Sequence, residues 1–232
     1  MMSNMKKVFQ LLKYGHQVKL NVGLGLAFLV FGLFAKVVGI TSIGIDFLFP
    51  LMMPIFLCQM LYGLDYVKMI SSANLKRWLT VYVPDLLVNV SVLLALVLYY
   101  VLTELRSSYP DWLILNEDIH AGAISMPIGN IMFCAGMLAF VLMCYIAGCY
   151  KCYWISTGVF LVSMAAYGAA STWILNPFGE VPWRLNEGQG ILAAALFYLA
   201  GAVVSGAIRR ILYKVPISSV AIGKRLGMEG KA

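Results

Sequence analysis

The chain has 232 residues, of which 62% are hydrophobic and 12% are charged. A soluble globular domain carries roughly 25% charged residues, so this chain has too little polar surface to coat a water-soluble core. We therefore expect an all-α integral membrane protein. The net charge of +7 does not predict a nucleic-acid partner, because the cations lie at the ends of the apolar segments.

The first 20 residues have the pattern of an amphipathic helix. Met5, Phe9 and Leu12 recur at helical spacing, and lysines fall elsewhere around the helix. Such a helix lies on a membrane surface with its cations near anionic headgroups. The residues that we assign to this interfacial helix include Lys6, Lys7, Phe9 and Lys13. The alternative interpretation is a disordered polar start.

Six apolar segments follow, each near the roughly 20 residues that a helix needs to cross the hydrocarbon of a bilayer. We place them at about 21–41, 45–64, 77–103, 124–149, 153–174 and 190–212. Pro84 predicts a kink in the third segment. Strands are not expected, because open strands leave unpaired backbone groups in lipid.

The distribution of Lys and Arg predicts the orientation. With both termini in the cytoplasm, only Lys36, Arg106 and Arg184 of the 17 cations fall outside or near the outer face. Cytoplasmic loops are enriched in Lys and Arg, so we expect a multi-pass protein of the cell membrane with both ends inside. The expected organisation is the surface helix 1–20, the transmembrane domain 21–212 and a basic cytoplasmic tail 213–232.

The cytoplasmic connection at about 65–78 is basic and helix-forming, and Tyr66 and Ile70 fall on one helical face. Ser71 or Ser72 can cap a helix that begins near Asn74. We expect a soluble partner to push on the membrane domain here. The residues that we assign to this contact are Lys68, Ser71, Ser72, Asn74, Lys76 and Arg77.

Asp85 and Asn89 are polar residues inside the third segment, four apart and therefore on one helical face. Polar groups in hydrocarbon cost free energy unless something satisfies them. One interpretation is a Pro84 kink packed against another helix, with Asp85 near the inner headgroups. The other is that both residues face a polar cavity or a charged partner, as part of a translocation path.

Other polar residues within or near the segments predict packing contacts. Gln59 and Asn130 are candidates for hydrogen bonds between helices. Lys36 can extend toward the outer surface or pair with Asp46. Small residues at spacings of four or seven allow helices to approach closely, within or between subunits. Examples are Gly25 with Gly32, Gly201 with Ser205, and Ala202 with Gly206.

Signatures of catalysis are few. The sequence has no Gly-rich loop ending in Lys and Ser or Thr for ATP, and no His-Glu-x-x-His pair for zinc. We therefore expect no metal site and no cofactor on this chain. Cys149 and Cys152 form a Cys-x-x-Cys pair that could support thiol–disulfide exchange, with chance occurrence as the alternative.

The order of these parts resembles the membrane subunit of ABC-2 type exporters. The amphipathic start, the six segments and the helical connection 68–77 before the third segment carry the resemblance, although the Leu-Pro pair frequent in that family is replaced by Ser71-Ser72. Its small size and compact outer loops look most like bacterial peptide-exporter permeases, such as those of the phenol-soluble modulin exporters.

The resemblance implies a permease that is not itself an enzyme, working as a homodimer or heterodimer on two cytosolic ATPase subunits that bind ATP and Mg. The cargo would be an amphipathic peptide or another hydrophobic molecule. Two alternatives stay open: an ion- or proton-coupled transporter or channel that uses Asp85 and Asn89, and a membrane thiol-redox enzyme that uses Cys149 and Cys152.

Overall fold

The structure, a computed structural model, contains helices and no strands in the part of the chain that it describes: Lys7, Gln10 and residues 18–38, 47–66, 76–108, 127–175 and 183–221. Its elements are α2 (Val18–Val38), α3 (Leu48–Tyr66), η3 (Trp78–Tyr82), α5 (Val83–Ser108), α7 (Ile128–Gly148), α8 (Tyr153–Leu175), α9 (Glu187–Ile211) and η4 (Leu212–Lys214).

Five helices are long and apolar enough to cross a membrane: α2, the continuous η3–α5, α7, α8 and α9. The chain is therefore a multi-pass membrane protein by helix length and hydropathy. The second expected span corresponds to α3, whose apolar run Leu48–Tyr62 is shorter than the other five. The expected all-α class is confirmed for the described residues, and five of the six expected spans are long and apolar enough to cross a membrane.

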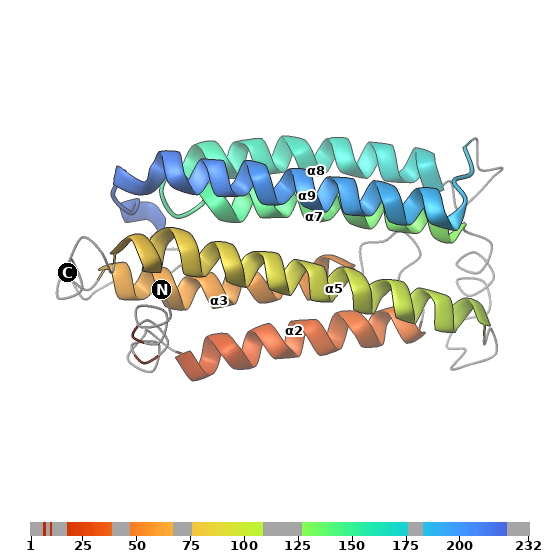
Figure 1. Cartoon of the computed structure of the whole chain (residues 1–232), viewed down its shortest axis with the longest axis horizontal. Helices are drawn as coiled ribbons and strands as arrows, with labels where there is room; N and C mark the ends of the chain where they lie inside the picture. Colours follow the sequence, from red (N-terminus) through yellow and green to blue (C-terminus); the bar gives the residue numbers. More distant parts are fainter. Residues whose placement is uncertain are drawn as a thin grey trace.

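Successive long helices run in alternating directions, and they form two groups (Figure 1). One group contains α2, α3 and α5, and the other contains α7, α8 and α9. α7 lies at the centre of the second group and carries the largest share of the buried core. α5 contacts both α7 and α9, and so joins the two groups.

Small residues allow helices to approach closely in the described part of the chain. A Cβ atom on Gly136 of α7 would lie 2.6 Å from the Cα atom of Ala194 of α9. In the other group, a Cβ atom on Gly32 of α2 would overlap the ring of Pro50 in α3. The expected close packing is confirmed at Gly32, whereas Gly136 was not among the residues predicted for it; both contacts lie within one chain.

A π-helical turn, η3, lies directly before Pro84, the residue at which a kink was expected. The Val83 N–H donates to the Trp78 carbonyl, five residues earlier. Pro84 has no N–H, so it cannot make the bond to the Thr80 carbonyl that a regular α-helix requires. The chain absorbs this defect by widening one turn, and the helix continues into α5.

The ends of α9 have clear local causes. Asn186 and Gln189 form a capping box, with hydrogen bonds of 2.8 and 3.1 Å between side chains and backbone, which starts the helix earlier than the predicted residue 190. After η4 the chain is extended at Val215, before Pro216. The Ser218 N–H then donates to the Tyr150 carbonyl in the turn between α7 and α8, at 2.9 Å.

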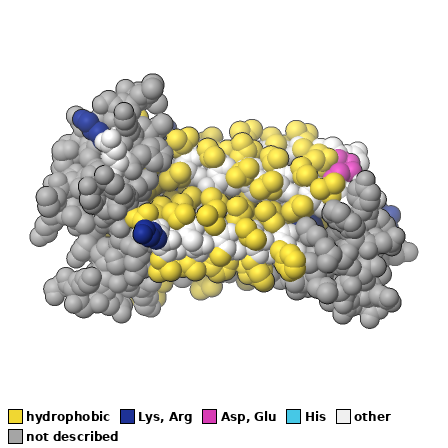
Figure 2. Space-filling view, turned by 90° about the horizontal axis from the view of Figure 1, so that it is seen from below, with side chains coloured by type: hydrophobic (Ala, Val, Ile, Leu, Met, Phe, Trp, Pro, Cys, Tyr) yellow, Lys and Arg dark blue, Asp and Glu magenta, His cyan; other side chains and the backbone are white. Residues whose placement is uncertain are grey.

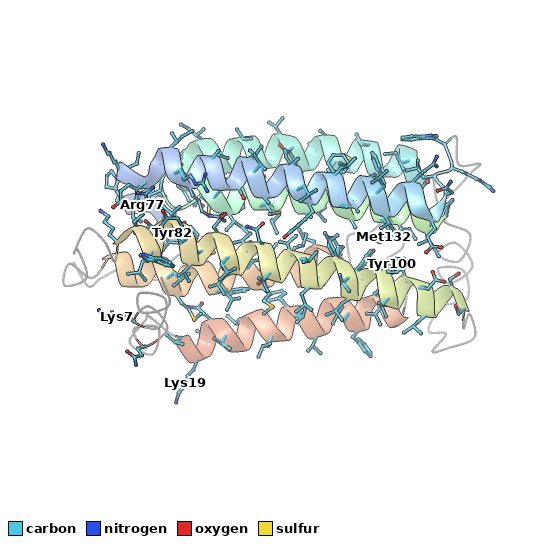
Figure 3. The ribbon with its side chains drawn as sticks, in the orientation of Figure 1. Lys7, Lys19, Arg77, Tyr82, Tyr100 and Met132 are labelled. Carbon is cyan, nitrogen blue, oxygen red and sulfur yellow. The ribbon has the colours of Figure 1, made fainter. Side chains whose placement is uncertain are left out.

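Hydrophobic side chains cover the middle of the molecule (Figure 2). Lys and Arg show mainly toward the left end in that view, and Asp and Glu toward the right end. Lys7, Lys19 and Arg77 lie at one end of the bundle (Figure 3). This separation is the pattern from which the orientation was predicted, and the orientation itself stays a prediction.

The predicted surface helix is described at two positions only. Lys7 and Gln10 are helical and exposed. Lys6, Phe9 and Lys13 lie outside the described residues.

Candidate functional site: a polar seam between α5 and α9

Polar side chains follow the line of contact between α5 and α9, where the two helix groups meet. We call this line the polar seam; it consists of Asp85, Asn89, Tyr100, Glu187, Tyr198, Ser205 and Arg209. The two helices are antiparallel, so residues early in α5 face residues late in α9.

An ion pair lies at one end of the seam. Arg209 Nη1 donates to Asp85 Oδ1 at 2.6 Å, and the side chains of Arg209 and Asp85 are 1% and 29% exposed. At 1.5 Å per residue, Asp85 lies about 10 Å inside the end of the candidate span that begins at Trp78. The pair therefore lies within the membrane-spanning region, where isolated charges are costly.

Several neighbours approach this pair. Ser205 accepts a 3.5 Å hydrogen bond from Arg209 Nη1, and Gly206 leaves room for the Asp85 carboxylate, 3.6 Å from where a Cβ atom would stand. Arg209 Nε and Nη2 make no hydrogen bond of good geometry to any residue in the described ranges. The guanidinium thus has donor capacity beyond its bond to Asp85.

Asn89 extends the seam by one helical turn. Its Nδ2 donates to the Asp85 carbonyl at 2.7 Å, and its own carbonyl accepts a 3.4 Å hydrogen bond from the Tyr198 hydroxyl of α9. Asn89 Oδ1 is buried without a hydrogen-bond partner among the described residues. The prediction that Asp85 and Asn89 share a face is confirmed, and Arg209 is the charged partner of Asp85.

The other end of the seam is closed by Tyr100 and Glu187. The Tyr100 hydroxyl donates to Glu187 Oε1 at 2.5 Å, at the N-terminus of α9. α5 and α9 are therefore joined near both ends and at an intermediate position. The contacts are few and directional, so they fix the register of the two helices more than they add cohesion.

The predicted partner-contact residues are described in part. Lys76 is half-buried and Arg77 is exposed, with the Arg77 guanidinium 5.5 Å from the centre of the Tyr82 ring. Lys68, Ser71, Ser72 and Asn74 lie outside the described residues. Thr80 Oγ1 donates to the Lys76 carbonyl at 2.8 Å, which ties the first turn to η3.

The two cysteines of the Cys-x-x-Cys pair have different surroundings. Cys149 is fully buried, and its thiol lies 3.6 Å from the Ile146 carbonyl. Cys152 is partly exposed and lines a cavity that Cys149 does not line. Both are free thiols. A thiol-exchange site needs its attacking thiolate to be accessible, which Cys149 is not.

Asn130 and Lys36 make contacts between segments. Asn130 is fully buried; it donates to the carbonyls of Ile174 and Trp183, at 3.0 and 2.7 Å, and accepts from the Leu185 N–H at 2.8 Å. The expected hydrogen bonding of Asn130 is therefore confirmed. Lys36 Nζ donates to the Tyr99 hydroxyl at 3.3 Å and is 8% exposed, so it lies inside the bundle; Asp46 is outside the described residues.

Sequence reasoning missed Tyr100, Glu187, Tyr198 and Arg209 as members of this site, and it identified Ser205 only as a small packing residue. Arg209 precedes Arg210 at the end of the last span, and the pair has the pattern of ordinary cytoplasmic cations. The signal in the sequence was that Arg209 lies inside the predicted span 190–212, while another predicted span carries an acidic residue, Asp85. Among the described residues, no group of three or more His, Cys, Asp or Glu side chains could hold a metal ion.

No protein-family model matches this chain, and the searches of curated proteins and of solved structures found no similar protein.

Proposed function

We propose that this chain is the membrane-spanning permease subunit of an ATP-driven exporter, moved by separate cytosolic ATPase subunits. The observation that carries the proposal is the Asp85–Arg209 ion pair. It joins α5, the helix that follows the predicted partner contact, to α9 in the other helix group. The resemblance to ABC-2 permeases supports the same function.

Force applied at the end of the third span has a continuous route through the protein. Arg77 is exposed at the start of the route, and η3 continues directly into α5. Asp85 then transfers displacement of α5 to Arg209 on α9, because a buried ion pair resists separation. α9 packs closely on α7, so the second group would move as a unit.

The ends and faces of the bundle suit such a subunit. The exposed cations at the Arg77 end offer charge to an ATPase surface, and the apolar faces suit an amphipathic peptide or other hydrophobic cargo. The working unit would be a homodimer or a heterodimer with a similar permease. ATP and Mg would bind to the ATPase chains.

The test is to purify the chain from its native membrane under mild detergent and to measure ATP hydrolysis of the complex. We expect a stoichiometric ATPase chain, and we expect the double variant Lys76→Ala/Arg77→Ala to lower the transport-coupled rate severalfold. Lys19→Ala is the matched control, since Lys19 is an exposed cation at the same end on α2. A complex without ATPase, or equal rates in both variants, would overturn the proposal.

A second candidate is an ion- or proton-coupled transporter, which the position of Asp85 within a candidate span favours. It predicts uptake by the purified chain alone in proteoliposomes with an imposed ion or pH gradient. Asp85→Asn should abolish that uptake. Gradient-driven uptake without any ATPase would favour this function over the permease.

A further inference from the structure

The π-helical turn η3 lies between two groups to which a role is assigned. Arg77 directly precedes it and belongs to the predicted partner contact, and Asp85 follows it and pairs with Arg209. A π turn takes one residue more than an α-helical turn for one rotation of the backbone. The turn therefore changes the angle between the helix faces on which Arg77 and Asp85 lie.

The extra residue brings these two side chains onto one face of the helix. An α-helix turns by about 100° per residue, so side chains eight positions apart, as Arg77 and Asp85 are, would point about 80° apart in a regular helix. With one residue absorbed by the π turn, they point only about 20° apart. Arg77 therefore lies on the helix face that carries Asp85, which is the face turned toward α9.

A contact of Arg77 agrees with this arrangement. Its guanidinium lies 5.5 Å from the centre of the Tyr82 ring, five positions later, at the start of η3–α5 (Figure 3). In a regular α-helix, side chains five positions apart point about 140° apart, so the wider turn favours this contact. Arg77 is exposed, whereas Lys76, one position earlier, is half-buried. A rotation by one position would thus exchange an exposed place for a half-buried one.

We propose that η3 is a positioning element, which turns Arg77 onto the face of Asp85 so that a partner bound at Arg77 pushes along the α5–α9 contact. Pro84 disfavours the α-helical form of this turn, because a proline ring clashes with the carbonyl four residues earlier. The turn is also held by packing, since three of its side chains are buried: Leu79, Thr80 and Val81. The partner rests on the proposed permease function, whereas the face on which Arg77 lies does not.

The first experiment changes the spacing of Arg77 and Asp85 in the full-length protein in nanodiscs. One alanine inserted after Thr80 lengthens the helix between them and should turn Arg77 by about 100°, into the half-buried place of Lys76. The matched control is one alanine inserted directly before Lys76. It adds the same residue to the chain and leaves the spacing of Arg77 and Asp85 unchanged.

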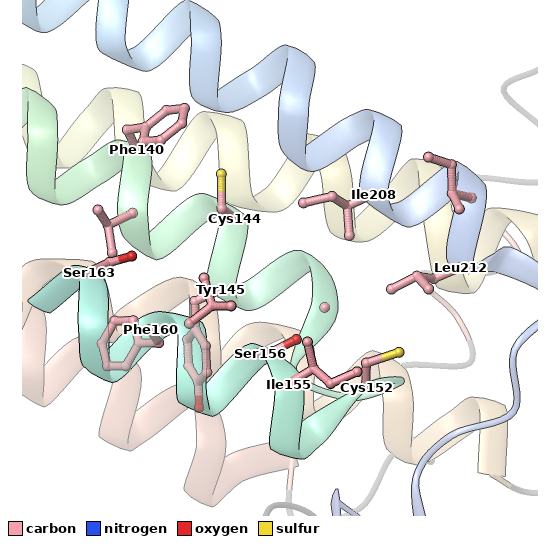
Figure 4. A pocket seen from close by; sticks show the side chains of 14 residues that line it. Phe140, Cys144, Tyr145, Cys152, Ile155, Ser156, Phe160, Ser163, Ile208 and Leu212 are labelled. Atoms are coloured by element: carbon pink, nitrogen blue, oxygen red, sulfur yellow. The ribbon is translucent and has the colours of Figure 1, made fainter.

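The rotation is read from the rate at which a maleimide labels single cysteines. The parent carries Cys144→Ala/Cys152→Ala, because these two cysteines are partly exposed and line a cavity among α7, α8 and α9 (Figure 4). In this parent, Arg77→Cys should react severalfold faster than Lys76→Cys. The insertion after Thr80 should slow Arg77→Cys to the rate of Lys76→Cys, and the control insertion should leave it fast.

A second measurement needs no change of length. Two cysteines can be bridged only when their Cα atoms lie within about 7 Å, whereas five residues of an α-helix rise about 7.5 Å. The wider turn shortens this separation, so Arg77→Cys/Tyr82→Cys should form a disulfide on mild oxidation. Val97→Cys/Leu102→Cys has the same spacing within the regular part of α5 and should not.

The functional readout is ATP hydrolysis of the complex purified from the native membrane, whose coupled rate should fall severalfold with the insertion after Thr80. Three results would overturn the proposal: equal labelling of Arg77→Cys after the two insertions, no disulfide between positions 77 and 82, or an unchanged coupled rate although Arg77 has turned. If labelling and disulfide behave as expected but no ATPase co-purifies, the permease function fails, and η3 still determines the face on which Arg77 lies.

Discussion

Arg209 and Asp85 each depend on the other, because neither charge has an alternative strong partner among the described residues. Removing one member of a buried ion pair leaves an uncompensated charge in a medium of low dielectric constant. The free-energy cost of an unpaired charge is larger for Arg209 than for Asp85, because the Arg209 side chain is 1% exposed and the Asp85 side chain is 29% exposed.

We predict that Asp85→Ala lowers the free energy of unfolding by about 3 kcal/mol, the low end for a buried pair because Asp85 is partly exposed. The double variant Asp85→Asn/Arg209→Met should recover most of this loss, because it leaves no unpaired charge. Unfolding in mixed detergent micelles gives the measurement.

Arg210→Gln is the matched control for this prediction, since Arg210 is the exposed neighbour of Arg209. It should change the free energy of unfolding by less than about 0.5 kcal/mol. A double variant no more stable than Asp85→Ala would show that the ion pair is not what makes the single variant costly.

Asn130 is a buried residue whose side-chain amide donates two hydrogen bonds and accepts one. We predict that Asn130→Ala lowers the free energy of unfolding by about 3 kcal/mol, because two carbonyls and one N–H each lose a buried partner. Asn130→Asp should be at least as damaging, because a carboxylate keeps the acceptor but presents oxygen to two carbonyls. Measuring both variants by denaturant titration tests this, and an Asp variant close to the wild type would contradict it.

At the scale of helices, the pairing of α7 with α9 depends on small residues. A Cβ atom on Gly136 would meet the backbone of Ala194 at 2.6 Å, whereas one on Gly158 of α8 would meet nothing within 4 Å. The same substitution at the two glycines therefore has opposite expected effects, although both are within helices.

We predict that Gly136→Ala lowers the free energy of unfolding by about 1–3 kcal/mol, because α7 and α9 must separate to admit the methyl group. Gly158→Ala should leave stability unchanged or raise it by up to about 1 kcal/mol, since alanine restricts the unfolded chain. Thermal unfolding of the two purified variants makes the comparison. Equal destabilisation at both sites would refute the packing argument.

The helices themselves could be predicted from sequence, whereas their local irregularities could not. Long apolar runs predict helices because backbone groups in hydrocarbon must be satisfied within the segment. Pro84 predicted a defect in the helix, but not that the defect takes the form of the π-helical turn η3. The start of α9 at Glu187 follows from Asn186 and Gln189, a local signal that hydropathy does not register.

For the whole molecule, the sequence predicted which residues are unusual but not which of them meet. Asp85 and Asn89 were identifiable as polar residues in a span, and the alternative of a charged partner was open. Identifying Arg209 as the partner of Asp85 requires the antiparallel placement of α5 and α9. The two residues are separated in sequence by more than half of the chain. Periodicity is a local property, so it predicts faces of helices and not their partners.

The alternating directions of the helices make the predicted orientation in the membrane testable. Helix ends at Val18, Tyr66, Trp78, Tyr153 and Ile211 gather at one end of the bundle, which is the end with Arg77 (Figures 1 and 3). If Lys and Arg mark the cytoplasmic side, that whole end is inside. Arg184, exposed before α9, then lies outside.

We predict that Arg77→Cys and Lys214→Cys resist a membrane-impermeant maleimide in intact cells and react in inverted vesicles, while Arg184→Cys shows the reverse. The parent chain serves as the background control, because Cys58, Cys134 and Cys149 are buried and Cys144 and Cys152 are only partly exposed. Labelling of Arg77→Cys from outside would place the start of η3–α5 beyond the reach of any cytosolic ATPase. The proposed permease function would then fail, while the Asp85–Arg209 pair would still join the two helix groups.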